Sequence, residues 1–494
     1  MGLSIAQEQF EPLDYKNFSD RVRLDLSVLQ QLLQRQGFGE GPGSIGAEVE
    51  FYIVDADCRV KPINSRIEVR LEDPLLTMEL NRFNLEYNLS PQPFSGSPFL
   101  RSENELNRAV ERINEVAAPL GGKLVSIGIL PTLRKKNINA SMMTDVPRYH
   151  VLSKALCEMR GGPFQIHIGG RDELNFEADD VTLEGANTSY QLHWRVPASR
   201  FADYYNAVQL VTPVVLGLAA NSPSLFQKNL WDETRIALFK QSIDSRTEHE
   251  RDLSQPPRVY FGNGWVRSAW ETFAAAVALY KPIIPIVGEE DPRQVLAAGG
   301  TPALEQLRLH HGTTWPWNRA VYDHNEGGHL RIEMRALPAG PTAIDMSANG
   351  LFMIGAALAL VDEMPQLASV MPFHYAEHNF YRAAKYGLDA TLIWPGQNQF
   401  ELREQPLAEI AASLLPRAQE ALATTELDSI EIRRLLSVIG ARLEAGISGS
   451  RWQRAVTAKY RRRHGKREAY KLMLEQYMAN SDSRRPLHEW SMKI

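Results

Sequence analysis

The feature that most constrains this chain is a strictly alternating run, G-A-E-V-E-F, inside the apolar stretch Ser44–Val54. A strand places its apolar residues on one face and Glu48 and Glu50 on the other. Two carboxylates on one half-buried face repel each other by about 4 kcal/mol at roughly 4 Å and an effective dielectric constant of about 20. Hard oxygen ligands suit Mg²⁺ or Mn²⁺, which usually hold nucleotide phosphates. A strand face exposed to water shows the same pattern, so both interpretations are open here.

A second alternating run, Phe83–Leu89, carries another acid. Its polar face consists of Asn84, Glu86 and Asn88, so a third carboxylate stands beside amides that can hydrogen-bond an ordered ligand. An exposed edge strand gives the same alternation. The sequence leaves open whether Glu86 faces a site or solvent.

Two further runs carry histidines. Thr188–Trp194 places Gln191 and His193 on one face, and these are neutral side chains that bind metals or contact phosphates. In the short alternating run Gln165–Ile168, His167 is either a ligand or a hydrogen-bonded structural histidine.

The run His329–Pro338 places Arg331, Glu333 and Arg335 on one face. An acid between two arginines indicates one of two arrangements. It is either a structural ladder of salt bridges, or a metal carboxylate with cations for a phosphate or a developing oxyanion.

One more arginine follows a long predicted helix that begins near Ser199 and ends at Asn221-Ser222-Pro223. Arg235 comes after the polar loop that leaves this helix. It is either paired with Glu233 at the surface or an anion clamp that faces the strands.

The patterns divide the chain into three regions. Residues 1–43 have the spacing of a helical lead-in, the alternating strands fall within residues 44–345, and residues 346–494 are almost entirely helical in pattern. The apolar window Ala348–Val361 is too short to span a membrane and predicts a buried helix. A basic cluster at residues 461–467 is typical of a solvated helix face, with nucleic-acid binding as the alternative.

Composition excludes several classes of function. The chain of 494 residues is 44% hydrophobic and 23% charged, as in ordinary soluble proteins, and its net charge of −5 gives no general reason to bind nucleic acid or anionic membranes. The first fourteen residues lack the basic segment and apolar run of a secretory signal, which predicts a cytoplasmic protein. Cys58 and Cys157 are too far apart for a disulfide scaffold or a zinc site, so both are expected to be inert.

The order of these motifs resembles the glutamate-cysteine ligase family, in its plant and actinobacterial branch, within the carboxylate-amine ligases related to glutamine synthetase. Gly46–Glu50 resembles the family's E-x-E strand, Glu79–Glu86 resembles its second pair of acids, and Thr188–His193 resembles its T-x-x-V-Q-V-N strand. Ala220–Pro223 and Thr234-Arg235 resemble its A-N-S-P and S-x-R elements. His310–Pro316 resembles its H-x-T-x-x-P segment, and Arg331–Pro341 resembles its L-E-M-R-x-x-x-x-G-P signature. The last motif is the most specific.

The resemblance implies an α+β fold in which a curved antiparallel sheet, backed by helices, forms an active-site bowl in residues 44–345. It implies an ATP-dependent ligase that joins a carboxylate, expected to be the γ-carboxylate of glutamate, to cysteine or another amine through an acyl phosphate. The implied ligands of Mg²⁺ (or Mn²⁺) are Glu48, Glu50, Glu79, Glu86, Gln191 and Glu333. Arg335 and Arg331 would stabilise the transferred group and bind ATP, His193 would contact its phosphates, and Arg235 would bind a substrate carboxylate.

Two departures from the family lie near the expected amino acid substrates. The E-P-G-G-Q context of the acidic pair is absent, and Phe239 stands where a tryptophan is common. A metal-dependent amidase, a phosphotransferase and a non-catalytic binding protein are therefore kept as alternatives. The expected partners are small-molecule amino acids, with neither nucleic acid nor membrane. Whether the helices after Asp345 cover the site or form a homodimer is left open.

Overall fold

The computed structural model describes residues 9–396 and 401–492, so the first eight residues of the predicted helical lead-in lie outside it. At the centre of the described chain is a seven-stranded antiparallel sheet in the order β12-β13-β7-β1-β3-β2, with β4 paired to the second half of β1. Its strands are β1 (Ser44–Val54), β2 (Leu76–Met78), β3 (Asn84–Pro93), β4 (Lys123–Val125), β7 (Tyr190–Val196), β12 (Asn318–Asp323) and β13 (His329–Met334). The predicted curved antiparallel sheet is confirmed.

The alternation of β1 determines how the sheet is layered. Ala47, Val49 and Phe51 are buried in the apolar core, whereas Glu48 and Glu50 are half-buried on the other face. Facing residues of antiparallel strands have neighbouring side chains. The register pairs Glu48 with both Asn88 and Gln191, and Glu50 with Glu86, so the polar faces of three strands meet.

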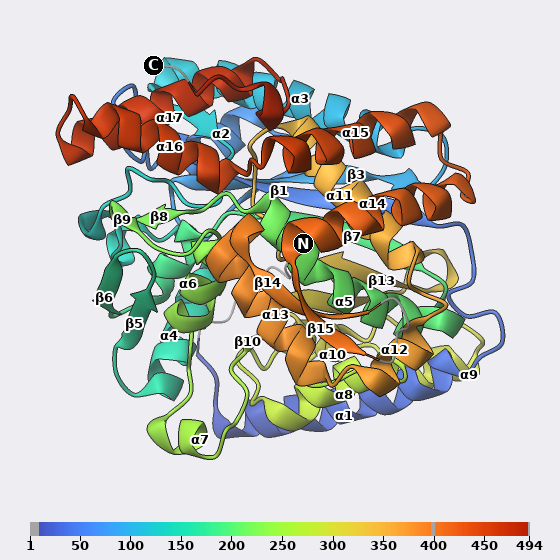
Figure 1. Cartoon of the computed structure of the whole chain (residues 1–494). Helices are drawn as coiled ribbons and strands as arrows, with labels where there is room; N and C mark the ends of the chain where they lie inside the picture. The colour runs from blue at the N-terminus through green and yellow to red at the C-terminus, as the bar shows by residue number, and fades with distance from the viewer. Residues whose placement is uncertain (1–8, 397–400, 493–494) are drawn as a thin grey trace.

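Helices cover the apolar face of the sheet. α3 (Pro98–Ala117) contacts β3 and β4, and α11 (Ala343–Leu358) contacts α3 and α5 (Phe201–Ala219). Gly350 of α11 lies against the side chains of Tyr190 and Leu192, which are on the apolar face of β7. Figure 1 shows α5 and α11 lying over the strands. The predicted helix from Ser199 is α5, and the apolar window that begins at Ala348 forms the buried part of α11.

The region after Asp345 is less uniformly helical than predicted. Its helices are α12 (Met364–Val370), α13 (Phe373–Tyr386), α14 (Leu407–Ala423), α15 (Ser429–Ala445), α16 (Gly449–Arg461) and α17 (Lys466–Asp482). A two-stranded sheet of β14 (Thr391–Pro395) and β15 (Leu402–Pro406) interrupts them. The side chain of Asn379 bonds both the amide and the carbonyl of Ile393, which holds β14 extended beside α13.

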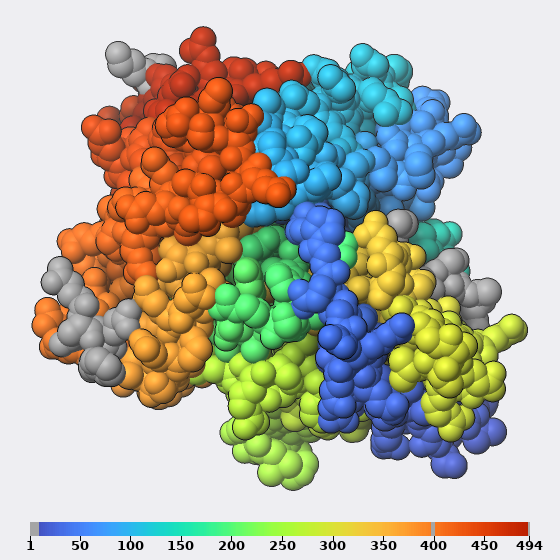
Figure 2. Space-filling model, turned by 90° about the vertical axis from the view of Figure 1, so that its right-hand side faces the viewer, coloured from blue at the N-terminus to red at the C-terminus, as the bar shows by residue number. Residues whose placement is uncertain are grey.

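Segments far apart in the sequence pack side by side. Figure 2 shows the C-terminal helices, in orange and red, against the light blue residues near α3, where Arg434 pairs with Glu103 at 2.7 Å. At the opposite end, α1 (Pro12–Leu33) contacts α8 (Ala269–Leu279) and α10 (Glu305–His311). One cluster of buried apolar residues runs from Phe18 to Trp490. Among the described residues, no helix has both the length and the apolar character needed to cross a membrane.

Candidate active site

Three polar side chains from three adjacent strands meet on the concave face of the sheet. Glu48 on β1, His193 on β7 and Glu333 on β13 each offer one ligand atom, and these atoms all lie within 4.8 Å of one another. His193 Nε2 is 3.2 Å from Glu48 Oε1, while its buried Nδ1 has no hydrogen-bond partner. Carboxylate and imidazole donors suit Mn²⁺, and the carboxylates suit Mg²⁺. This donor set therefore fits a divalent cation.

Gln191 connects this group to the next acid along β1. Its amide nitrogen donates to Glu50 Oε1 at 3.0 Å, and its amide oxygen accepts from Arg335 at 2.5 Å. The other oxygen of Glu50 accepts from the backbone amide of Ser189 at 2.7 Å. Burial raises the pKa of Glu50 despite the nearby charge of Arg235. Both polar atoms of the Gln191 side chain are thus engaged with other site residues.

Two further predicted acids line the β2–β3 side of the bowl. Glu86 Oε1 accepts from Thr77 Oγ1 at 3.2 Å and from Asn88 Nδ2 at 3.3 Å. Glu79 lies just after β2, where burial and the charge of Glu50 raise its pKa to about 8. Burial, together with the charges of the neighbouring acids, raises the pKa of Glu86 well above its usual value. These acids lie close together without enough neighbouring positive charge to stabilise all of their ionised forms.

Sequence reasoning missed a further acid at this site. Glu184 lies in the 3₁₀ helix Val181–Ala186, which carries no strand alternation to mark its direction. Burial, then the charges of Glu79 and Glu50, raise its pKa to about 8. Glu184 therefore belongs to the same acidic group, although nothing local in the sequence indicates it.

Glu333 is held between two arginines. Arg319 Nε on β12 donates to its Oε2 at 2.6 Å, and Arg335 Nη1 donates to its Oε1. Burial alone would raise the pKa of Glu333, but these two guanidinium groups outweigh it and lower the pKa. Sequence reasoning also missed Arg319. The alternation of Asn318–Asp323 would have put it on the polar face of its strand, and the strand register places it directly opposite Glu333.

The other two predicted arginines occupy different environments. Arg331 lies two residues before Glu333 on the same face of β13 and pairs with Asp323 at 2.9 Å, in a partly exposed position. Arg235 is 2% exposed, and pairs with the fully buried Glu233 at 3.2 Å while it donates to the carbonyl of Ala336 at 3.0 Å. The predicted ion pair thus forms in the interior and not at the surface, and a role in substrate binding stays a prediction.

Two sets of residues singled out in the sequence lie outside the bowl. His167 is on the separate two-stranded sheet of β5 (Phe164–Gly169) and β6 (Glu173–Ala178), where its Nδ1 lies 2.5 Å from Asn175 Oδ1. Cys58 and Cys157 are free thiols, and burial raises the pKa of each. A raised pKa disfavours the reactive thiolate, as expected of inert cysteines.

Comparison with protein families supports the picture given by the geometry. A family model described as glutamate-cysteine ligase family 2 (GCS2) matches residues 44–476. The chain belongs to this family. It is accordingly an ATP-dependent carboxylate-amine ligase. No curated protein matches the chain.

A solved structure shares this fold at low sequence identity. The glutamate-cysteine ligase of Francisella tularensis, solved in complex with AMP, has a TM-score of 0.55 and 11% identity, and the match covers 90% of each chain. A bifunctional glutathione synthetase from Pasteurella multocida has a TM-score of 0.45 and 11% identity, with 94% of this chain and 55% of that chain covered. The first of these likenesses establishes a shared fold for this member of the glutamate-cysteine ligase family.

Proposed function

We propose that this enzyme joins the γ-carboxylate of glutamate to the amino group of cysteine or a related amine, with hydrolysis of ATP to ADP and phosphate. Family membership supports the ligase class. The observation that carries the proposal is the convergence of Glu48, His193 and Glu333 beside a group of further acids on one concave face. We place this catalytic machinery within residues 44–345.

The residues on the concave face fit divalent cations. Glu48, His193 and Glu333 would hold one ion, and Glu50, Glu79 and Glu86, joined by Glu184, would hold others on the β2–β3 side, with Gln191 at the boundary between them. Bound Mg²⁺ or Mn²⁺ would neutralise the phosphate oxygens of ATP and orient the γ-phosphoryl group. In this arrangement His193 would contact the phosphates of ATP beside the bound cations.

The protein's own side chains supply fixed positive charge at the reacting centre. A carboxylate oxygen of the substrate attacks the γ-phosphorus and ADP leaves; the deprotonated amine nitrogen then attacks the acyl carbon, and phosphate leaves as the C–N bond forms. Arg335 is held by Gln191 and Glu333, so it is already oriented toward negative charge that develops on the phosphoryl group and the tetrahedral oxyanion. Arg331 adds a second positively charged side chain, and Arg235 binds the substrate carboxylate.

Release of ADP and phosphate tests this function directly. We expect turnover only when ATP, a divalent cation, glutamate and an amine are present together, and mass spectrometry should detect the amide product. Systematic pairing of acids and amines identifies the two substrates. Amide hydrolysis without ATP, or phosphate release that does not depend on an amine, would contradict the proposal.

A further inference from the structure

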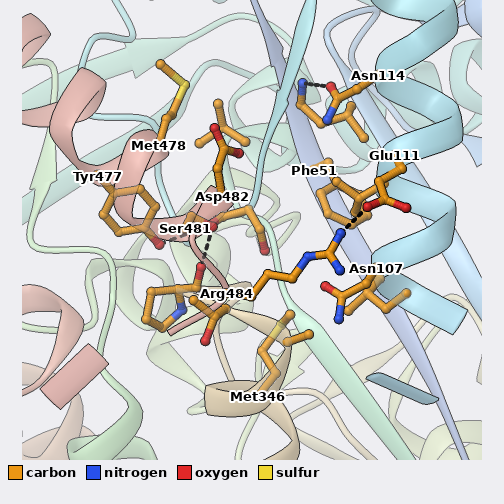
Figure 3. Close-up of a pocket in the computed structure, with 18 residues that line it drawn as sticks. Phe51, Asn107, Glu111, Asn114, Met346, Tyr477, Met478, Ser481, Asp482 and Arg484 are labelled. Carbon is orange, nitrogen blue, oxygen red and sulfur yellow. Dashed lines mark hydrogen bonds and ion pairs between the residues drawn. The ribbon is translucent and has the colours of Figure 1, made fainter. Parts of the chain in front are cut away.

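A cavity lies on the opposite side of the sheet from the acids. It has a volume of about 270 Å³ and is enclosed by α3, α17, the edge formed by β1 and β4, and the segment that begins at Pro341. Figure 3 shows side chains of α3 and α17 facing each other across it. Ligand pockets usually measure about 300–1,000 Å³. The cavity is therefore suited to a compact ligand and too small for a nucleotide.

The lining has two chemical parts. Apolar side chains form about half of the wall, among them Phe51, Val110 and Met478, beside polar side chains such as Asn107 and Ser126. Charged side chains stand at the rim, where Arg484 pairs with Glu111, and Asp482 is 2.6 Å from Lys123. A partly apolar interior with both signs of charge at its rim is complementary to a zwitterion that has an apolar side chain.

One polar group of the lining has no partner among the described residues. The hydroxyl of Ser126 is buried and makes no hydrogen bond. A buried polar atom without a partner costs about 1–3 kcal/mol. In contrast, Arg484 and Glu111 are each about half exposed, so their ion pair opens at little cost. A ligand that enters at this pair gains polar contacts inside the cavity.

Hydrogen bonds connect the cavity wall to the candidate active site. Tyr477 lines the cavity, and its hydroxyl donates to the carbonyl of Ser126 at 2.8 Å and accepts from Asn221 Nδ2 at 2.9 Å. The backbone amide of Asn221 donates to Glu233 at 2.8 Å, and Glu233 pairs with Arg235. Arg235 in turn bonds the carbonyl of the residue that follows Arg335.

We propose that this cavity is a regulatory site for a free α-amino acid with an apolar side chain. The apolar part of the wall receives the side chain, Arg484 binds the carboxylate, and Glu111 and Asp482 bind the ammonium group. Displacement of Tyr477 alters the position of Arg235 through Asn221 and Glu233, so the occupied cavity changes the affinity of the bowl for its substrates.

Binding is tested first, without any reaction. Titration calorimetry of the full-length protein, without ATP, uses L-leucine, L-methionine and L-phenylalanine as probes. We expect one binding event for at least one of them, weakened tenfold or more by Arg484→Ala and lost in Val110→Trp, whose indole fills the cavity. Arg112→Ala is the matched control, because Arg112 lies on the same helix outside the cavity and pairs with Asp73.

The outcomes of this titration are distinct. Absence of binding by all three probes overturns the site, and so does binding that survives both Arg484→Ala and Val110→Trp, since the amino acid is then bound elsewhere. Arg484 is at the exposed rim, so its variant reports on binding even if Val110→Trp fails to fold. None of these results depends on the proposed ligase reaction.

Coupling is tested second, and this part rests on the proposed function. A saturating apolar amino acid should change the dissociation constant of a non-hydrolysable ATP analogue at least about fivefold, and the analogue should change the amino acid's affinity by the same factor. Tyr477→Phe keeps the ring but removes the hydroxyl, so it should still bind the amino acid while the coupling falls below twofold. Unchanged nucleotide affinity in the wild-type protein would overturn the regulatory role.

Discussion

The two halves of the acidic bowl differ in how their charge is balanced. In the arginine half, formed by β12 and β13, Glu333 is fully buried but lies between Arg319 and Arg335, and its pKa is lowered. In the acid half, formed by Glu79, Glu86 and Glu184, each pKa is raised, first by burial and then by neighbouring acids.

This difference indicates that the two halves of the bowl have different functions. The arginine half is complete in the protein alone, so it holds its geometry before any ligand arrives. In the acid half the carboxylates are crowded, and their raised pKa values mean that either protons or bound cations must neutralise them. We infer that the first half positions charge for the reaction, with Glu333 at the edge of the ion that Glu48 and His193 would hold, and that the second half binds the other divalent cations.

The largest expected effect is in the arginine half. Glu333→Gln removes the counter-charge of two partly buried arginines, so the free energy of unfolding should fall by about 3 kcal/mol, and ADP release should fall about 100-fold or more. Denaturant unfolding and steady-state assays measure both. As a control, Glu326→Gln removes a carboxylate that is 73% exposed and paired with Arg195, and should change stability by less than about 1 kcal/mol. Unaltered turnover in Glu333→Gln would remove Glu333 from the site.

The acid half should respond in the opposite direction. Glu86→Gln removes one of several mutually repelling acids, so it should stabilise the metal-free protein by roughly 1–2 kcal/mol. It should also reduce the stabilisation that excess Mg²⁺ confers, because a ligand is lost. Unfolding in EDTA and in Mg²⁺ measures both effects, with Glu468→Gln, at an exposed position of α17, as a neutral control. Destabilisation in EDTA would show that the two halves do not differ as inferred.

A buried acid outside the bowl, whose pKa is raised mainly by burial, separates the effect of burial from that of crowding. Burial raises the pKa of Glu431, at the start of α15, from 4.5 to about 7, although one oxygen accepts from Leu100 N at 2.7 Å. The folded protein therefore binds this proton more tightly than the unfolded chain, so stability falls as pH rises from about 4.5 to about 7. Glu431→Gln should reduce this loss by roughly 2 kcal/mol, equally with and without Mg²⁺. Dependence of the effect on Mg²⁺ would mean that the metal response is not specific to the acid half.

Local periodicity explains what could be predicted. Glu48, Glu86, Gln191 and Glu333 lie on strands whose apolar alternate residues enter the core, and a period of two fixes the direction of every side chain once one face is buried. The sheet and its polar concave face were therefore predictable. The order of the strands was not, since it depends on pairings between residues more than a hundred positions apart.

The remaining errors have a tertiary origin. Glu184 is in a turn of 3₁₀ helix, so its direction is set by the packing of Val181–Ala186 and not by alternation. The pair of Arg235 with Glu233 was predictable from their spacing, but its burial is not, because it depends on the contacts that Glu233 makes with Asn221 and Ser222. The strand β14 likewise exists because Asn379 of a neighbouring helix bonds its backbone.

The smallest effect is expected where the arginine half meets solvent. Arg331 pairs with Asp323, whose pKa is about 2 because Asn325 N and Arg331 outweigh burial, so the pair is ionised at any working pH. The arginine is 30% exposed, and Arg331→Lys should change stability by less than about 1 kcal/mol.

Kinetics then distinguish the roles of the two arginines on β13. Arg331→Lys loses a planar fork that can bind ATP, so KM for ATP should rise about 3–10-fold while kcat changes less than about twofold. Arg335→Lys, inside the buried network with Gln191 and Glu333, should lower kcat instead. Steady-state rates with ATP as the varied substrate measure both. Equal losses of kcat in the two variants would mean that Arg331 also acts in the transition state, and that the arginine half extends to the edge of the bowl.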